Sequence, residues 1–192
     1  TRERILTTAL NLFSAKGYTS VSTRDIADEA GVNEVTIFRL FGRKENLYAE
    51  VFNTFKINPD SDLLLGGIKH ELMHDLDSIG RGFSRLFIRN SKIVNMSMRV
   101  VKSEFKNIDK ELKQQIEDIA HLLEPYFIEM SEKGLIISDD PVKLAGMFTD
   151  VLFGYSLHVM KKGKLDMLSD GIVSLSAIFA RGISTQNTSS AE

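Results

Sequence analysis

The sequence predicts an all-α protein of about nine helices, and three observations support this fold class. Apolar residues recur at the helical period along most of the 192-residue chain, whereas the alternation typical of half-buried strands is hard to find. Proline occurs at only three positions, so long helices are seldom interrupted. Glycines and polar capping residues stand where the periodic segments begin and end.

The composition indicates an ordinary globular protein, with 43% hydrophobic and 26% charged residues. The absence of cysteine excludes a disulfide framework and a thiolate metal site. No apolar run approaches the ~18 residues of a membrane span, and the first residues do not form a signal peptide. We therefore expect a cytoplasmic protein without a membrane partner or a cofactor. The net charge of −2 argues weakly against a general nucleic-acid coat protein.

The first two helices are defined by their ends. A helix is expected over Arg2–Lys16, with Gly17 as its C-cap. Ser22 opens a second helix, because Asp25 three residues later completes a pair that resembles a capping box. Gly31 ends this helix. Each helix has an apolar stripe that is expected to be buried. The residues are Ile5, Ala9, Leu12 and Phe13 in the first helix and Ile26, Ala27 and Ala30 in the second.

A short third helix and a fourth helix follow. Asn33 is expected to cap a helix over Glu34–Phe41, which Gly42 ends. The fourth helix is expected over Lys44–Lys56. The segment 57–67 contains proline and two glycines, and it marks the strongest break in the pattern.

Longer helices are expected beyond this break. Their predicted ranges are 68–89, 91–105, 108–133 with a bend at Pro125, 140–162 and 165–181. The resulting division is a helix-turn-helix domain over 1–50, a helical ligand-binding and dimerisation domain over 51–183, and a polar, disordered tail over 184–192.

The turn at 30–33 joins two helices that are too short to be stable alone, so both must pack against their neighbours. Ile37 and Phe41, one turn apart, are expected to face inward with Val32 and Leu47. Three exposed apolar side chains on the other face would be unusual unless a partner covers them. The residues expected on that face are Glu34, Val35, Thr36, Phe38, Arg39 and Leu40. Apolar and threonine side chains can contact thymine methyl groups, and an arginine can reach guanine or phosphate.

Residues 1–52 closely resemble the DNA-binding domain of the TetR family of bacterial transcriptional regulators. The matching segments are ILTTALNLFSAKGY, STRDIADEAGV and TIFRLFGRKENLYAEV. The resemblance implies a homodimer that binds a palindromic operator in double-stranded DNA and releases it when a small-molecule effector binds the C-terminal domain. It places the DNA contacts at Ser22, Asn33, Glu34, Val35, Thr36, Phe38, Arg39 and Lys44.

Three positions depart from the family pattern. Phe38 stands where tyrosine is usual, Leu40 where histidine is common, and Arg43 where a small polar cap precedes the lysine. The docking mode is expected to survive, whereas the contacts made by these three side chains differ. A helical interaction module that has lost DNA binding is therefore one alternative function.

The segment HELMH at 70–74 provides a second alternative, because it matches the H-E-x-x-H motif of zinc hydrolases. On a helix, His70 and His74 would lie on one side with Glu71 as a general base. Such a site needs a third ligand, and the metzincin continuation of the motif is absent, since Asp77 stands where that pattern has glycine. Two surface histidines, weak metal candidates at most, are the favoured interpretation, and we expect no metal and no enzyme activity.

The C-terminal domain is rich in aromatic residues and methionine, which fill cores and also line adaptable pockets. The predicted effector-binding residues for a hydrophobic ligand are Phe83, Phe87, Met96, Arg99, Phe127, Phe153 and His158, with Glu104 and His121 as further polar candidates. Small residues among large apolar ones in the last two helices fit the dimer interface that the resemblance implies. Its predicted residues are Phe148, Leu152, Tyr155, Leu175 and Ile178. The hypothesis is a ligand-responsive regulator, most simply a repressor.

Overall fold

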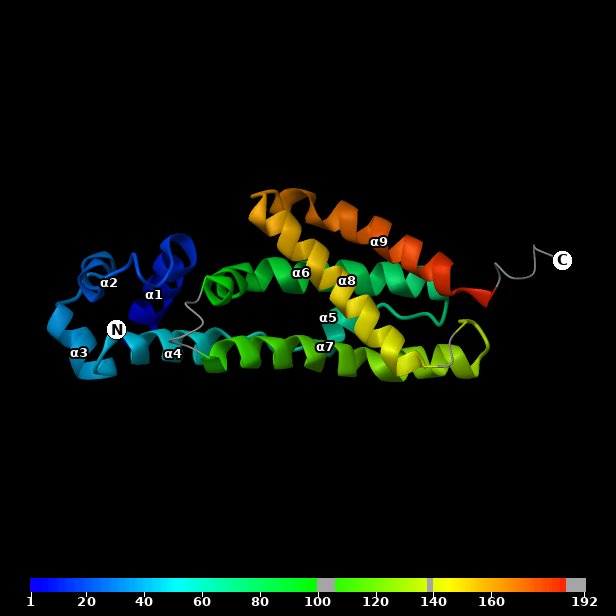
Figure 1. The fold of residues 1–192 in the computed structure, drawn as a ribbon, viewed down its shortest axis with the longest axis horizontal. Coiled ribbons are helices and arrows are strands. Elements are labelled where there is room, and N and C mark those ends of the chain that lie inside the picture. The colour runs from blue at the N-terminus through cyan, green and yellow to red at the C-terminus, as the bar shows by residue number, and fades with distance from the viewer. Residues whose placement is uncertain (100–105, 138–139, 186–192) are drawn as a thin grey trace. The chain divides into compact units, whose positions relative to one another are not determined.

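A computed structural model describes residues 1–99, 106–137 and 140–185, and these residues form nine α-helices (Figure 1). Within them the extended pairing is limited to one isolated antiparallel bridge, between Ile136 and Ser184. The prediction of an all-α protein is confirmed. Every helix in these ranges is too short or too polar to cross a bilayer. The chain forms two compact units: unit 1 comprises 1–57 and 90–114, and unit 2 comprises 58–89 and 115–192.

Unit 1 begins with four helices whose ends agree closely with the prediction. They are α1 (Arg2–Lys16), α2 (Thr23–Ala30), α3 (Glu34–Phe41) and α4 (Lys44–Phe55). Gly17, Gly31 and Gly42 follow the first three helices with positive φ, a conformation that glycine adopts without strain. The C-terminal ends of these three helices are therefore set by the glycine that follows each of them.

The core of unit 1 is built around three aromatic side chains from α1, the loop after it and α4. The Tyr48 ring lies edge-on to Phe13 and Tyr18, with centroid distances of 4.9 and 5.1 Å. The Tyr48 hydroxyl donates a hydrogen bond to the Met96 carbonyl oxygen over 2.9 Å. Burial raises the pKa of Tyr48 far above its usual value, so the hydroxyl remains a donor.

The C-terminal end of α6 (Leu72–Met98) and the residue after it also hold α1. Asn95 donates to the carbonyl oxygen of Ser14 over 2.9 Å, and Arg99 donates to that of Ala15 over 2.7 Å. Both carbonyls belong to the last turn of α1, where helical partners are lacking. Side chains from a distant part of the sequence therefore complete the end of the first helix.

Unit 2 contains α5 (Ser61–Leu65), most of α6, most of α7 (Lys106–Glu132), α8 (Pro141–Lys161), a 3₁₀ turn (Leu165–Met167) and α9 (Leu168–Ile183). The predicted helices 68–89 and 91–105 were wrong as two elements, because α6 runs without a break through Asn90. No proline or glycine stands at that junction, so packing on both sides can keep the helix continuous. The break at 57–67 also contains α5, which Asp60 caps.

Several sequence expectations lie outside the described residues. They are the end of the predicted helix at 100–105, which includes the candidate Glu104, the residues 138 and 139 before α8, and the tail from 186 onward. The other polar candidate, His121, is exposed on α7 and pairs with Glu124, which raises the pKa of its imidazole.

Close approach of helices in unit 2 depends on small residues. A side chain at Gly80 of α6 would collide with Ser176 of α9, and one at Gly171 would collide with the ring of Tyr155 on α8. The neighbouring hydroxyl of Ser156 is buried and donates back to the carbonyl oxygen of Leu152 over 2.7 Å. Small side chains thus allow α6, α8 and α9 to pack at short distance.

The capping box of α2 yields a stability prediction. The Asp25 N–H donates to the Ser22 hydroxyl oxygen over 3.0 Å, and the Ser22 N–H donates to the Asp25 carboxylate over 2.8 Å. We expect Ser22→Ala to lower the free energy of unfolding by about 1 kcal/mol at pH 7, measured by urea unfolding. Ser20→Ala, at an exposed serine in the preceding turn, serves as the control and should change stability by less than about 0.5 kcal/mol.

The same cap predicts the direction of a pH dependence. The side-chain hydrogen bond from Ser22 lowers the pKa of Asp25 below its ordinary value of 3.8. The stabilisation is therefore present above that pH and is lost as the pH falls through the lowered folded pKa. The stability difference between the wild type and Ser22→Ala should shrink in acid, and a constant difference down to pH 2 would contradict this account.

Candidate nucleic-acid interface

The α2–turn–α3 segment has the geometry of a helix-turn-helix. Gly31 adopts a left-handed conformation at φ 62°, and the Val32 N–H donates to the Ala27 carbonyl oxygen over 3.0 Å. The Asn33 side chain then accepts a hydrogen bond from the Val35 N–H over 2.9 Å, which caps α3 as predicted. These contacts reverse the chain within a few residues and set the angle at which α3 leaves α2.

One side of α3 packs against the rest of unit 1, and the half-buried Glu34 lies at the edge of that side. Ile37 and Phe41 are buried as predicted. Leu47 of α4, which was also expected to face inward, is fully buried. The half-buried Glu34 carboxylate accepts a hydrogen bond from the Thr23 hydroxyl over 2.6 Å. Glu34 therefore braces α3 against α2, an interaction that sequence reasoning missed because the two residues are eleven positions apart.

The opposite side of α3 is open and mostly apolar. Val35 is 69% exposed and Phe38 is 48% exposed, and Arg39 is exposed beside them. Thr36 and Leu40 are both half-buried. The prediction that Leu40 is an exposed residue of this face is therefore corrected: part of its side chain is covered. The open surface of α3 therefore consists mainly of Val35, Phe38 and Arg39.

The N-terminus of α4 places charged residues next to this helix. Lys44 is the first residue of α4, and its Nζ lies 4.0 Å from the centroid of the Tyr18 ring. The preceding Arg43 provides no side-chain cap. The Tyr18 hydroxyl donates to Glu45 over 2.8 Å. Neither Tyr18 nor Glu45 was among the predicted site residues, since an aromatic residue after a helix-ending glycine looks like ordinary core.

Ser22 is exposed, but its hydroxyl already makes two local contacts. It accepts from the Asp25 N–H and donates to the Asp25 carboxylate over 2.7 Å. Capping therefore accounts for this serine, and a phosphate contact at Ser22 stays a prediction. Together, the two short helices, the open face of α3 and the cationic start of α4 define a helix-turn-helix DNA-binding protein.

Comparisons with known proteins agree with this class. Residues 5–51 match the model of the bacterial regulatory proteins of the tetR family. The chain is 30% identical over 187 residues to YvkB, an HTH-type transcriptional regulator of Bacillus subtilis, and the match covers 96% of this chain and 97% of YvkB. The chain belongs to the TetR family, whose members are ligand-responsive, DNA-binding transcriptional regulators and not enzymes.

Solved structures share the fold over nearly the whole chain. A TetR-family regulator from Mesorhizobium loti superimposes with a TM-score of 0.70 at 18% identity, covering 96% of each chain. NalD of Pseudomonas aeruginosa superimposes with a TM-score of 0.69 at 16% identity, also covering 96% of each chain. At these identities the likeness concerns the fold alone.

The HELMH segment does not have the geometry that the zinc motif requires. The prediction that it lies on a helix was wrong, because α6 begins at Leu72 and His70 precedes it with a φ of +62°. His70 pairs with Glu129 over 3.0 Å, and His74 pairs with Asp75 over 3.2 Å. In the described parts of the chain, no three His, Asp or Glu side chains come together in a way that could hold a metal ion.

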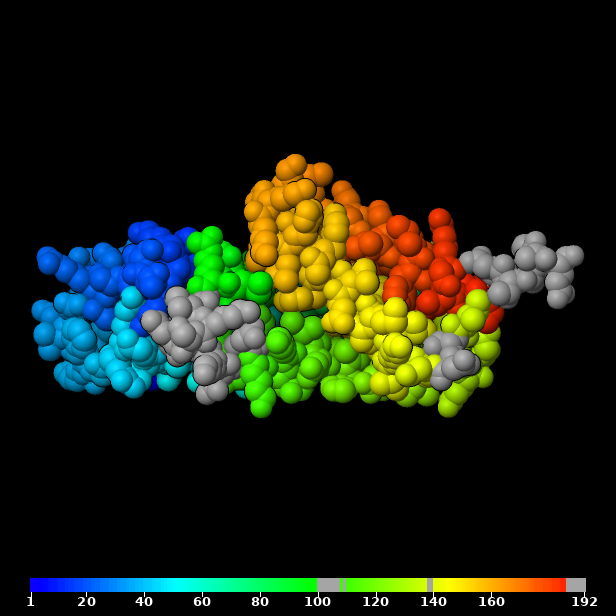
Figure 2. Space-filling view, viewed as in Figure 1, coloured from blue at the N-terminus to red at the C-terminus, as the bar shows by residue number. Residues whose placement is uncertain are grey.

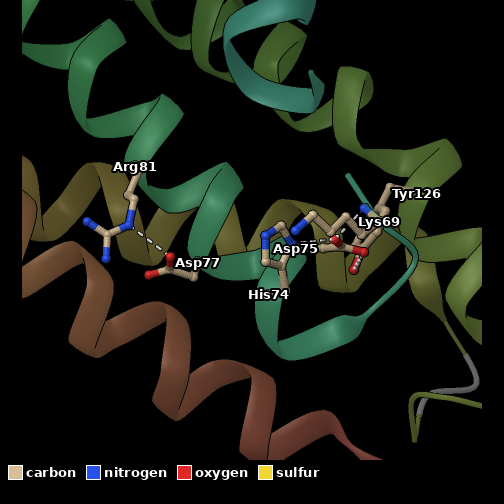
Figure 3. Close-up of polar contacts among 6 residues, drawn as sticks. All are labelled: Lys69, His74, Asp75, Asp77, Arg81 and Tyr126. Atoms are coloured by element: carbon tan, nitrogen blue, oxygen red, sulfur yellow. Dashed lines mark hydrogen bonds and ion pairs between the residues drawn. The ribbon is translucent and has the colours of Figure 1, made fainter. Parts of the chain in front are cut away.

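Asp75 instead organises a structural polar cluster in unit 2 (Figure 3). Its fully buried carboxylate accepts hydrogen bonds from the Lys69 N–H over 2.8 Å and from the Tyr126 hydroxyl over 3.3 Å. Burial, followed by the charge of Asp75, raises the pKa of Tyr126. Through Asp75, these contacts tie Lys69 and the start of α6 to Tyr126 of α7. A groove of about 320 Å³ adjoins this cluster, lined by His70, Glu71, Leu72, Met73, His74, Leu135 and Ser184.

The predicted effector-binding residues do not all lie in one place. Phe83, Phe87 and Phe153 form a chain of ring contacts in unit 2, with centroid distances of 6.5 and 5.8 Å. Phe127 is fully buried in the same unit, and His158 is exposed on α8. Met96 and Arg99 belong to unit 1, where the Met96 carbonyl and the Arg99 side chain hold α4 and α1. Those two residues have a structural role that sequence reasoning did not foresee.

The predicted dimer residues divide into buried and exposed sets. Phe148 and Leu152 are fully buried within the chain, so neither presents side-chain surface to a second copy. Tyr155 and Leu175 are half-buried, and Ile178 is 65% exposed. Figure 2 shows α8 and α9 lying next to each other on the surface of unit 2. On these helices the exposed apolar side chains are Val142, Met147, Val151 and Ile178.

Proposed function

We propose that this regulator is a repressor that binds a palindromic operator as a homodimer in the cytoplasm and leaves it when a hydrophobic effector binds unit 2. The observation that carries the DNA-binding part is the open face of α3, with Val35 and Phe38 exposed beside Arg39. Exposed apolar side chains on a short helix lower solubility unless a partner covers them. The major groove, with its thymine methyl groups, is a suitable partner.

The residues at this surface have different proposed roles. Val35, Thr36 and Phe38 contact thymine methyl groups, and Arg39 contacts guanine or phosphate. Asn33 and Ser22 cap their helices close to the DNA backbone, and Glu34 holds α3 against α2. Lys44 binds a phosphate at the N-terminus of α4, where the helix dipole also favours an anion.

Replacing these side chains gives different binding phenotypes. We expect Lys44→Ala to weaken binding to all DNA sequences and to lower the salt slope of log K by about 1 per protomer. Arg39→Ala should cost about 1–3 kcal/mol and relax the preference at one base pair. Fluorescence anisotropy on duplexes selected from a random pool measures both effects.

Controls separate base reading from general attraction. Arg81→Ala, which removes an exposed arginine of unit 2, should leave DNA affinity unchanged. Replacing thymine by uracil in the selected duplex removes only methyl groups. This replacement should weaken DNA binding by the wild type more than DNA binding by the Phe38→Ala variant. Failure of the wild type to bind any duplex at low salt would refute the proposed function.

The dimer proposal rests on the apolar surface of α8 and α9. Met147 and Val151 are one helical turn apart on α8, and Ile178 stands on α9, so a second copy can cover all three. A twofold dimer also matches the symmetry of a palindromic site. This proposal replaces Phe148 and Leu152 with their exposed neighbours.

A charge placed on this surface should therefore separate the protomers. We expect Ile178→Asp to shift the protein from dimer to monomer in sedimentation velocity and to lower operator affinity by at least about tenfold, since a monomer has only one recognition helix. Ile128→Asp places the same charge at an exposed isoleucine of α7 and should leave the dimer intact. Equal behaviour of the two variants would count against an α8–α9 interface.

The effector proposal rests on the ring contacts among Phe83, Phe87 and Phe153. Aromatic and aliphatic side chains predominate in pockets for hydrophobic ligands. The fold relative NalD is described as the secondary repressor of a multidrug efflux pump, which supports a repressor role here by analogy. His158 is exposed, and Met96 and Arg99 serve unit 1, so we omit these three from the proposed pocket.

Release of DNA by hydrophobic compounds tests this pocket. We expect a set of hydrophobic aromatic compounds to include one that lowers operator affinity, and Phe153→Ala should raise the concentration needed by about tenfold because ring contact is lost. Phe55→Ala, at a half-buried phenylalanine of α4, is the matched control and should not shift this concentration. An unchanged response in Phe153→Ala would remove that residue from the pocket.

A further inference from the structure

Tyr18 contacts two oppositely charged neighbours at the start of α4. The Lys44 Nζ lies 4.0 Å from its ring centroid, and its hydroxyl donates to the Glu45 carboxylate over 2.8 Å. Tyr18 itself is only 7% exposed. Its ring packs against Phe13 at 5.9 Å and against Tyr48 at 5.1 Å. The aromatic core therefore holds Tyr18 still, while its two functional parts face charged side chains.

The ring affects where the Lys44 ammonium lies. A tyrosine ring presents negative electrostatic potential on its face, which attracts an ammonium without needing a directed hydrogen bond from it. A free lysine side chain loses much conformational freedom when it binds a phosphate. Because the ring already restricts Lys44, less freedom remains to be lost on DNA binding.

The hydroxyl affects the neighbouring acid. A carboxylate beside Lys44 would repel a DNA phosphate and compete for the ammonium. The Glu45 carboxylate instead accepts hydrogen bonds from its own backbone N–H and then from Tyr18, and these lower its pKa, so it remains ionised in one place. Arg43 contributes no side-chain cap, so Glu45 also supplies the acceptor that the N-terminus of α4 lacks.

We propose that Tyr18 is a positioning residue for DNA-backbone binding, with its ring holding Lys44 in place for a phosphate and its hydroxyl holding the Glu45 carboxylate away from that phosphate. The inference rests on the proposed phosphate contact of Lys44. Tyr18 acts through its two neighbours, and the same buried side chain thus joins the core of unit 1 to the charge pattern at the start of α4.

A double-mutant cycle in the whole 192-residue chain tests the ring. Tyr18→Leu, Lys44→Ala and the double variant are compared with the wild type on one selected duplex between 50 and 200 mM salt. The salt slope of Tyr18→Leu should fall by nearly the same amount as that of Lys44→Ala, about 1 per protomer. The affinity of Tyr18→Leu relative to the wild type should therefore be lowest at 50 mM salt. For each lost phosphate contact, this difference should be about threefold smaller at 200 mM salt. The double variant should resemble Lys44→Ala.

A second arm tests the hydroxyl. Tyr18→Phe keeps the ring beside Lys44, so its salt slope should stay close to that of the wild type. It removes the hydroxyl, so the Glu45 carboxylate loses this hydrogen bond. Affinity at 50 mM salt should fall by about threefold, on the scale of one phosphate contact. Glu45→Gln should recover more affinity in the Tyr18→Phe background than in the wild type. Equal effects of Glu45→Gln in both backgrounds would overturn the role of the hydroxyl.

A core control separates positioning from loss of structure. Ile5→Val removes one buried methyl group from α1 without changing any of the three rings, so it should lower thermal stability and leave the salt slope unchanged. Binding is measured well below the melting temperature of every variant. If Lys44→Ala lowers the slope but Tyr18→Leu does not, the positioning role is wrong and the phosphate contact stands. If Lys44→Ala itself leaves the slope unchanged, the phosphate contact is wrong.

Discussion

The packing of α1 against α4 through Phe13, Tyr18 and Tyr48 is the interaction on which the DNA-binding surface depends. Helices α2 and α3 have eight residues each, and helices of that length do not persist in water without tertiary contacts. They are held because α1 and α4 present a rigid apolar surface with all three rings at least nine-tenths buried. The hydrogen bond from Tyr48 to Met96 and the contacts of Asn95 and Arg99 with α1 extend this support to the end of α6.

The surface that this core supports is only weakly basic. Residues 1–56 contain eight Lys and Arg against seven Asp and Glu, so long-range attraction to DNA is modest. Local arrangement must then provide much of the affinity. The Asp25 carboxylate accepts a hydrogen bond from the Ser22 N–H, and the Glu45 carboxylate accepts one from the Tyr18 hydroxyl; hydrogen bonds lower the pKa of each carboxylate. Acidic residues near the proposed DNA surface are thereby fixed in place.

Unit 2 illustrates how a sequence motif can mislead when its geometry is unknown. HELMH satisfies the spacing of a zinc site, but spacing implies ligand geometry only if the whole segment is helical. His70 stands outside α6, and the buried Asp75 collects hydrogen bonds from Lys69 and Tyr126. The segment is therefore explained by the satisfaction of a buried carboxylate, which would be costly to leave unpaired.

The amino-acid sequence by itself determined the all-α class, the family and the ends of α1 to α4. These features are local: a glycine with positive φ, a serine or asparagine cap and the apolar period each act within a few residues. The inward direction of Ile37 and Phe41 followed from the same period. Most residues proposed for DNA binding could be named in advance for this reason.

Only the tertiary structure decided the contacts between residues distant in sequence. Thr23 with Glu34, Tyr18 with Lys44, and Arg99 with α1 depend on how helices pack, and no local pattern encodes them. The same holds for α6, where packing maintains one helix through Asn90, and for Phe148 and Leu152, whose apolar character fits a dimer surface and a core equally well. Burial depends on the whole fold, and a helical period gives only the direction of a side chain.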